Sequence, residues 1–300
     1  MKKLFIIGNG FDRAHELPTA YNPHFKEIAE EIEQISYFWD IYQSREVDIW
    51  ADFENCLSHP DFNLLEEIFD GYAPDYLSDY ERDRNAIITQ VDFNGRLLEA
   101  LHLFVDRAEY AIDKVSPLSK YRDCFNQNDL FITCNYTHTL EKVYDIDSCN
   151  VLHIHGEAGK NNLILGYPEG NYEAEKYYYD VRKKGCGPYR VVDIEVHIED
   201  IFKDGLIDYY TYTAYNSLIN KTKSFYKSPQ TKKLEAFLKD INVDEIFVIG
   251  HSCAIDFPYF EYINHKFPLA RWMFSPFDEA TKHNIKKMID FIGIKLYELK

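Results

Sequence analysis

The sequence contains four short segments in which polar or glycine residues directly follow an apolar run. They are Gly8-Asn9-Gly10, Cys134-Asn135-Tyr136-Thr137, His155-Gly156 and Gly250-His251-Ser252. Glycine lets the backbone turn sharply, an asparagine amide can hold a hydroxyl or a water, and an imidazole exchanges protons near neutral pH. Ligands of doubly wound sheets bind at the carboxyl ends of the parallel strands. We therefore expect the four segments to form one shared site.

The first segment follows the apolar run at residues 4–7, which predicts a parallel strand buried on both faces. Residues 11–15 predict a short helix whose first N–H groups point back at the turn. Such a helix start attracts phosphate, because its donors are unpaired and its end of the helix dipole is positive. Gly8 and Gly10 supply two of the three glycines of the full dinucleotide fingerprint. A plain tight turn between strand and helix remains the alternative.

Asn135 and His155 are the candidate catalytic residues. Asn135 lies between a predicted strand at 129–133 and a predicted helix. Its side chain either holds a ribose hydroxyl or a water, or caps that helix. His155 stands next to Gly156 where a strand leaves the sheet, which suits an imidazole that acts as a base. A structural histidine that is hydrogen-bonded within the loop is the alternative.

Two further motifs match a metal site and a hydrolase nucleophile only in part. His153 and His155 would share one face of a strand, and such a pair can bind a metal. No third ligand with suitable spacing follows, so we expect no metal. Residues 250–254 lack the last glycine of the GxSxG nucleophile elbow, which leaves an esterase as a remote alternative. Ser252 can cap a helix that starts near Ile255 and can bind a phosphate or a ribose, and the two roles are compatible.

The composition limits the classes of protein and partner. A formal net charge of −17 over 300 residues repels nucleic acid, so we expect no broad nucleic-acid surface and disfavour nucleic-acid cleavage. No apolar segment reaches the length of a membrane span or of a signal-peptide core, which predicts a cytoplasmic protein without a membrane partner. The six cysteines include no CxxC pair and suit reduced thiols. Cys134 and Cys253 are expected to be small buried hydrophobes.

Strand and helix patterns alternate along much of the chain. Apolar runs predict the strands, and apolar residues at helical spacing predict the helices between them. Strands are predicted at 4–7, 129–133, 151–154, 163–166, 245–249, 272–275 and 294–297, and helices at 11–15, 137–144, 231–239 and 278–291. This alternation indicates an α/β fold with a doubly wound, mostly parallel, Rossmann-like sheet.

Two long stretches interrupt the alternation. Residues 22–128 carry mainly helical patterns, the longest at 85–115, and are interpreted as a large α-helical insertion. Residues 168–230 are rich in Tyr, Lys and Asp and predict an irregular and helical cover. We interpret both as parts of a single α/β domain that spans residues 1–300.

The ordered motifs GNGFD, CNYT, HIHG and GHSxxxD resemble those of the phage abortive-infection AbiH family. The likeness covers the N-terminal strand and turn, residues 128–168 and residues 244–260. It implies an effector of phage defence.

The same order of motifs is similar, more remotely, to that of sirtuin-like proteins. In those proteins a glycine turn holds the NAD diphosphate, an asparagine after a strand holds the nicotinamide ribose, and a His-Gly at a strand end is catalytic. The resemblance implies that NAD(P) binds here and that Asn135 and His155 are catalytic. The cofactor-binding residues that it implies are Gly8, Asn9, Gly10, Phe11, Asp12, Gly156, Gly250, His251, Ser252 and Asp256.

Two departures from the sirtuin pattern refine this prediction. The Asp-Phe-Arg that follows Ile-Pro in deacylase sirtuins is Thr19-Ala20-Tyr21 here, and the zinc-binding cysteine pairs are missing. The resemblance therefore implies hydrolysis of the nicotinamide–ribose bond of NAD(P) and not deacylation. A nucleotide-binding sensor without chemistry is the alternative. We expect the activity to be gated by homo-oligomerisation, by a defence-system partner or by the cover at residues 168–230.

Overall fold

The structure is a computed structural model that describes residues 2–32, 94–167 and 209–299, with shorter stretches at 42, 49–50, 53–58, 177–180, 193–196 and 203. The chain divides into two compact units. The first consists of residues 1–28, 99–168 and 228–300, and the second of residues 29–98 and 169–227. The second unit thus comes from the segments predicted as the insertion and the cover. Residues 22–28 and 99–128 of the predicted insertion belong instead to the first unit.

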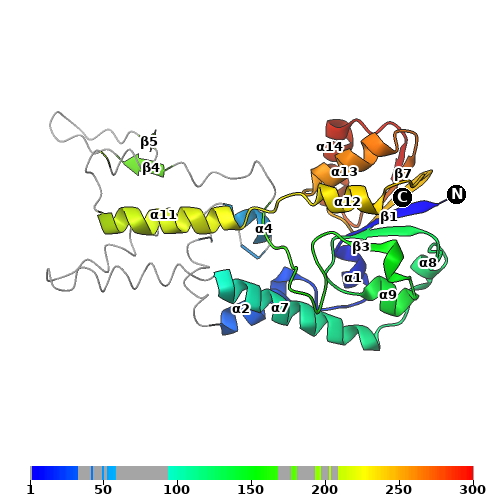
Figure 1. Cartoon of the computed structure of the whole chain (residues 1–300), viewed down its shortest axis with the longest axis horizontal. Helices are drawn as coiled ribbons and strands as arrows, with labels where there is room; N and C mark the ends of the chain where they lie inside the picture. Colours follow the sequence, from blue (N-terminus) through cyan, green and yellow to red (C-terminus); the bar gives the residue numbers. More distant parts are fainter. Residues whose placement is uncertain are drawn as a thin grey trace. The chain divides into compact units, whose positions relative to one another are not determined.

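The first unit is built on a parallel sheet of six strands (Figure 1). The strands are β1 (Lys3–Ile7), β2 (Leu130–Thr133), β3 (Val151–His153), β6 (Glu245–Ile249), β7 (Arg271–Ser275) and β8 (Tyr297–Leu299). They lie in the order β3-β2-β1-β6-β7-β8. Numbered among themselves, they follow the Rossmann order 3-2-1-4-5-6, in which the strand order reverses between β1 and β6. The predicted α/β fold class is confirmed.

β1 is central because both of its faces are apolar and both of its edges are paired, with β2 on one side and β6 on the other. Leu4 and Ile6 belong to one buried core, and Phe5 and Ile7 belong to the other. This alternation follows from the period of two in a strand. A run without polar residues therefore suits a strand that is covered on both sides.

Helices cover both faces of the sheet (Figure 1). Those on the first core are α12 (Thr231–Phe237), α13 (Phe257–Lys266) and α14 (Glu279–Ile292). Those on the second are α1 (Gly10–Ala14), α9 (Thr139–Tyr144) and the 3-10 turn η3 (Ile112–Lys114). Aromatic rings fill the second core: the ring of Phe5 lies 5.0 Å from that of Phe131 and 4.9 Å from that of Phe125.

The remaining described elements precede or connect these helices. α7 (Asn94–Ala111) is the described part of the helix predicted at 85–115, and residues 85–93 lie outside the described residues. The other elements of the first unit are η1 (Tyr21–Phe25), α8 (Ser119–Arg122) and η4 (Ser148–Asn150). The helices α2 (Lys26–Glu31) and α7 each have residues in both units. None of the helices among the described residues is long and apolar enough to cross a membrane.

The described part of the second unit contains α4 (Phe53–Cys56), an antiparallel pair of strands and the helix α11 (Tyr209–Ser224). The pair consists of β4 (Tyr177–Asp180) and β5 (Asp193–Val196). Within this unit the Tyr42 hydroxyl lies 2.7 Å from Thr222 Oγ1, and Lys227 Nζ lies 3.5 Å from Glu54 Oε2. The predicted irregular and helical cover therefore also includes a strand pair.

Two strand predictions were wrong. Residues 163–166 form a loop, because the Ile164 N–H donates to the carbonyl of His155 and its carbonyl accepts from the Tyr136 hydroxyl. The last strand is β8 and not residues 294–297. Ile294 still belongs to the turn after α14, and pairing with β7 begins where the Trp272 N–H donates to the Leu296 carbonyl.

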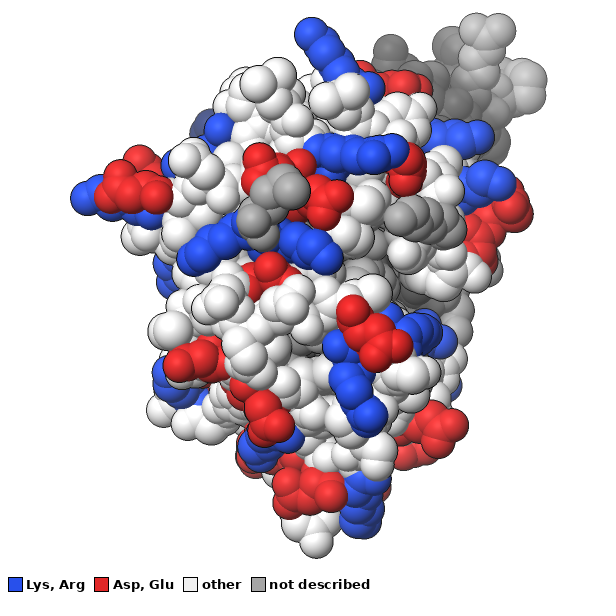
Figure 2. Space-filling model, turned by 90° about the vertical axis from the view of Figure 1, so that its right-hand side faces the viewer, with Lys and Arg blue, Asp and Glu red and all other residues white. Residues whose placement is uncertain are grey.

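Acidic and basic side chains are mixed on the face of the molecule that Figure 2 shows. Lys and Arg side chains lie beside Asp and Glu side chains across this face, and no large area of it carries one sign of charge alone. The net charge of −17 is therefore not gathered into a single acidic patch on this face.

The turns that follow β1 and β6 pack directly against each other. The Gly8 N–H donates to the carbonyl of Ile249, and the Gly10 N–H donates to that of Gly250. A Cβ on Gly8 would lie 2.6 Å from His251 Cα, and one on Gly250 would lie 2.3 Å from the backbone nitrogen of Phe11. These distances leave no room for a side chain, so the glycines let the two backbones meet.

Gly250→Ala tests this packing. Gly250 has a φ of +64°, so an alanine there adds backbone strain to the steric clash with Phe11. We expect a loss of about 3 kcal/mol or more in the free energy of unfolding, measured by urea denaturation. Gly293→Ala is the matched control, since Gly293 also has a positive φ (+75°) but open space around it, and it should cost only about 1 kcal/mol. Equal losses in the two variants would contradict the packing argument.

Candidate functional site

A buried carboxylate lies between two imidazoles at the carboxyl edge of the sheet. Asp256 Oδ1 is 3.3 Å from His155 Nε2, and its Oδ2 is 3.4 Å from His251 Nε2. All three side chains are at least nine-tenths buried. His155 follows β3, whereas His251 and Asp256 belong to the loop between β6 and α13. The fold thus joins the ends of two strands that are not neighbours in the sheet.

The hydrogen bonds of His251 determine its tautomer. The Cys253 N–H donates to His251 Nδ1 across 3.0 Å, so Nδ1 carries a lone pair. Nε2 therefore carries the proton and donates to Asp256. One oxygen of Asp256 is engaged in this way, which leaves the other oxygen for His155.

The loop that carries Asp256 is strained. Gly250, Cys253 and Asp256 all have left-handed backbone conformations, with φ values of +64°, +53° and +67°. For residues other than glycine this costs about 1–2 kcal/mol each and is concentrated at functional sites. Asp256 is the N-cap residue of α13, yet its side chain makes no capping hydrogen bond. The strained backbone turns its carboxylate toward the histidines.

Asn135 connects three strand ends. Its side-chain Nδ2 donates to the Gly8 carbonyl across 3.3 Å, and its backbone carbonyl accepts from His153 Nδ1 across 3.1 Å. Its amide also hydrogen-bonds to Asp12. The N-cap of α9 is His138, so the alternative prediction that Asn135 caps this helix is wrong.

Asp12 supports the loop that carries Asn135. Its carboxylate accepts hydrogen bonds from the hydroxyls of Thr137, at 2.5 Å, and Thr139, at 2.9 Å. Burial raises the pKa of Asp12 to about 6, although the hydrogen bonds from Thr137, Thr139 and Asn135 act in the opposite direction. In this structure Asp12, predicted to bind the cofactor, joins α1 to the β2–α9 loop.

Several polar groups of the glycine turn already form hydrogen bonds to other groups of the protein. The N–H groups of Gly10 and Phe11 donate to the carbonyls of Gly250 and Gly8, and the Asn9 amide donates to the carbonyl of Thr19. The Phe11 ring packs in the aromatic core, and α1 has only five residues. Diphosphate binding at this turn stays a prediction that would have to use the other amides of the turn.

Gly156 and Ser252 lie in the loops on either side of the cluster. Gly156 has a φ of +95°, and a Cβ there would lie 2.3 Å from the carbonyl oxygen of Asn162. Ser252 Oγ accepts from the Ala254 N–H across 3.4 Å. Because α13 begins at Phe257, the prediction that Ser252 caps this helix is wrong.

Two groups of side chains could each supply three metal ligands. In each group, one ligand atom per residue lies within 4.8 Å of the others. The groups are Cys134, His155, Asp256 and His138, His153, Glu157. β3 ends at His153, so the prediction that His153 and His155 share a strand face is wrong, and the two histidines belong to different groups.

Sequence reasoning missed the polar partners of these histidines. Cys134, expected to be a small buried hydrophobe, is half-buried and donates its thiol weakly to Asp256 Oδ2 at 3.9 Å. Cys253 is fully buried in the first core, as expected. The glutamates that contact His138 and His153 come from α7, α9 and the loop after β3, and nothing in their sequence spacing relates them.

A parallel sheet in the Rossmann order, with buried polar residues at its carboxyl edge, defines a Rossmann-like α/β protein. The family model for bacteriophage abortive infection AbiH matches residues 4–276. The chain therefore belongs to the AbiH family, which gives it a role in abortive infection by phage and confirms this part of the sequence prediction. Neither curated proteins nor solved structures include a match to the chain.

The variant Asp12→Asn tests whether burial raises the pKa of the Asp12 carboxyl group. Because the pKa of Asp12 is raised from 3.8 to about 6 in the fold, the folded protein keeps a proton that the unfolded chain releases at lower pH. Stability therefore falls as the pH rises from about 4 to about 6. Relative to Asp12→Asn, the wild type should lose about 2 kcal/mol of unfolding free energy between about pH 4 and pH 7.

The measurement is urea unfolding of both proteins across this pH range. The asparagine keeps the shape of the side chain and does not titrate, so the difference between the two curves reports Asp12 alone. Curves that run parallel would show that Asp12 titrates alike in the folded and unfolded chains.

Proposed function

We propose that the protein is an abortive-infection effector that binds NAD(P) and hydrolyses its nicotinamide–ribose bond. The observation that supports this most strongly is the buried pair of His155 and Asp256 at the carboxyl edge of the sheet. Asn135 follows β2, the strand next to β3, and its side-chain amide donates a hydrogen bond to the carbonyl of Gly8. The point where the strand order reverses, between β1 and β6, is where ligands of such sheets bind.

His155 acts as the general base in this mechanism. Its Nε2 lies 3.3 Å from Asp256 Oδ1, and the imidazole takes a proton from the attacking water. The water oxygen forms a bond to C1′ of the ribose. The C1′–N bond breaks, and its electron pair neutralises the pyridinium charge of the leaving nicotinamide. Asp256 stabilises the imidazolium that forms on His155, as a buried carboxylate does in a catalytic triad.

Asn135 positions the attacking water or a ribose hydroxyl. The bonds from its amide to Gly8 and Asp12 fix the orientation of its side chain before substrate arrives. Such preorganisation lowers the reaction barrier, because the polar groups need not reorient as charge develops. The mechanism uses only protein groups and water.

The second candidate function is a sensor that binds a nucleotide without chemistry. The engagement of Asn135, Gly10 and Phe11 in hydrogen bonds within the protein favours it, because these groups then have structural roles. A sensor would show a rise in melting temperature with NAD or ADP-ribose. It would release no nicotinamide.

His155→Ala and Asn135→Ala test the proposed hydrolase. With purified protein and NAD, we expect nicotinamide release to fall below detection in both variants, because one lacks the base and the other the positioning amide. Asp256→Asn should slow release by about 10²–10⁴-fold, because a neutral amide stabilises the imidazolium poorly. Chromatography of free nicotinamide gives the rate.

His283→Ala is the control, since His283 is an exposed histidine on α14. It should match the wild type. Circular dichroism and the melting temperature establish that each variant is folded. Wild-type activity in both alanine variants would reject the proposed mechanism, and a melting temperature that NAD leaves unchanged would reject the dinucleotide site itself.

A further inference from the structure

We propose that His138, His153, Glu157 and Glu141 form a binding site for a divalent transition metal, with Zn²⁺ as the best match. One nitrogen of each histidine and one oxygen of Glu157 lie within 4.8 Å of one another. His138 precedes α9, Glu141 lies in α9, His153 ends β3 and Glu157 follows β3. The ligands therefore come from two segments, α9 with the residue before it and the end of β3 with the loop that follows.

Both imidazoles are oriented as metal ligands are. His138 Nδ1 lies 2.9 Å from Glu109 Oε1, and His153 Nδ1 lies 3.1 Å from the carbonyl oxygen of Asn135. Each of these oxygen atoms accepts a hydrogen bond from Nδ1, so Nδ1 carries the proton of the neutral imidazole. Nε2 of each ring therefore has a lone pair. Metal-binding histidines almost always have such a partner on the second nitrogen, which fixes the tautomer and makes the ligand more basic.

Both Nε2 atoms face carboxylates. His138 Nε2 lies 3.2 Å from Glu157 Oε2, and His153 Nε2 lies 2.9 Å from Glu141 Oε1. A lone pair cannot face a carboxylate oxygen at this distance unless a cation, either a proton or a metal ion, lies between them. The other oxygen of Glu141 is buried and has no hydrogen-bond partner among the described residues. This buried oxygen is a second, independent indication of a bound cation.

The donor atoms select the kind of metal. Two imidazoles and carboxylate oxygens suit Zn²⁺ and related transition metals, whereas Ca²⁺ and Mg²⁺ prefer oxygen ligands alone. Lys142 contacts Glu109 and Lys160 contacts Glu157, each at less than 3 Å, so two lysines offset three carboxylates. The remaining negative charge favours a divalent cation.

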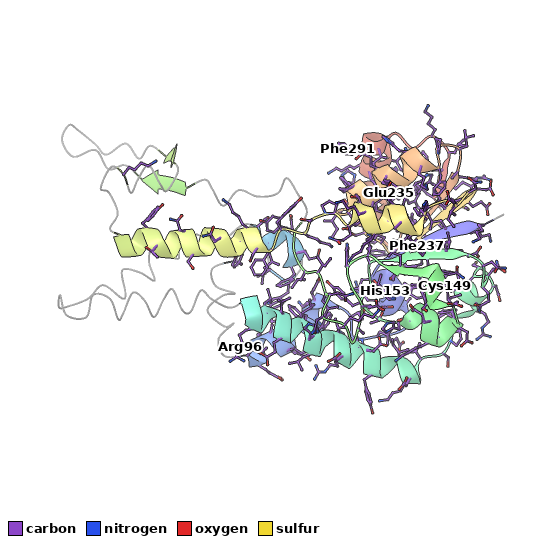
Figure 3. All side chains as sticks on the ribbon, in the orientation of Figure 1. Arg96, Cys149, His153, Glu235, Phe237 and Phe291 are labelled. Atoms are coloured by element: carbon purple, nitrogen blue, oxygen red, sulfur yellow. The ribbon has the colours of Figure 1, made fainter. Side chains whose placement is uncertain are left out.

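The position of the site indicates a structural role. His153, which Figure 3 labels, hydrogen-bonds through Nδ1 to the backbone carbonyl of Asn135 and lies two residues before His155. A metal held by His138, His153 and Glu157 would fasten the β2–α9 loop to the segment after β3. These loops carry the two residues proposed as catalytic, so the metal would hold their spacing without touching substrate.

The alternative occupant is a proton on each histidine. Glu109 and Glu157 raise the pKa of His138 to about 8 against the opposing effect of burial, so imidazolium–carboxylate pairs could fill the cluster alone. A proton and a metal differ in stoichiometry and in response to chelation. The test uses that difference.

The experiment is isothermal titration of the full chain with ZnCl₂ after treatment with EDTA and dialysis. We expect one Zn²⁺ per chain with a Kd of about 1 μM or tighter, and a higher melting temperature with Zn²⁺ present. His138→Gln, His153→Gln and Glu157→Gln should each weaken binding by about 100-fold or more. Glu157 is partly exposed, so its variant keeps the test valid should a histidine variant fail to fold.

Two controls separate this site from its surroundings. His283→Gln changes an exposed histidine, and Cys134→Ser changes the other group of potential ligands. Both should keep the stoichiometry and affinity of the wild type. No binding at about 100 μM Zn²⁺, unchanged binding in His138→Gln and Glu157→Gln, or loss of binding in Cys134→Ser would overturn the proposal.

Discussion

The close contact between the turns after β1 and β6 is the constraint on which the site depends. Gly8 and Gly10 meet Gly250 and His251 backbone to backbone, at distances that exclude a side chain. This contact lies where the strand order of the sheet reverses, so it sets the distance between the two halves of the carboxyl edge. His251 and Asp256 belong to one half, and Asn135 belongs to the other. A looser contact would move the carboxylate of Asp256 away from His155.

Buried carboxylates organise the loops around this contact. Asp256 joins the histidines of two strand ends, and Asp12 joins α1 to the loop that carries Asn135. Burying a charge is costly unless it is hydrogen-bonded, and both groups meet that condition with several partners. The strained backbone at Asp256 adds to this cost. Costs of this kind are expected where a site must be rigid before its ligand binds. The proposed metal would connect two of these segments, the β2–α9 loop and the loop after β3.

The sequence predicted the sheet and the edge where its polar strand ends meet, because periodicity and glycine turns are local signals. The strand at β1 was predicted from four apolar residues that lie on alternating faces. Contacts between distant segments left no such signal. Nothing in the spacing of Glu109, Glu141 and Glu157 indicates that they surround two histidines. The apolar run at residues 163–166 wrongly predicts a strand, because the run does not reveal that its backbone hydrogen-bonds to a loop.

We propose that the carboxyl edge of this sheet hydrolyses NAD(P) during phage infection. The most direct test is the NAD content of phage-infected bacteria that express either the wild-type chain or His155→Ala. We expect NAD to fall after infection only in cells with the wild-type chain, and protection of the culture to be lost with the variant. An unchanged NAD content in cells that are still protected by the wild-type chain would contradict it.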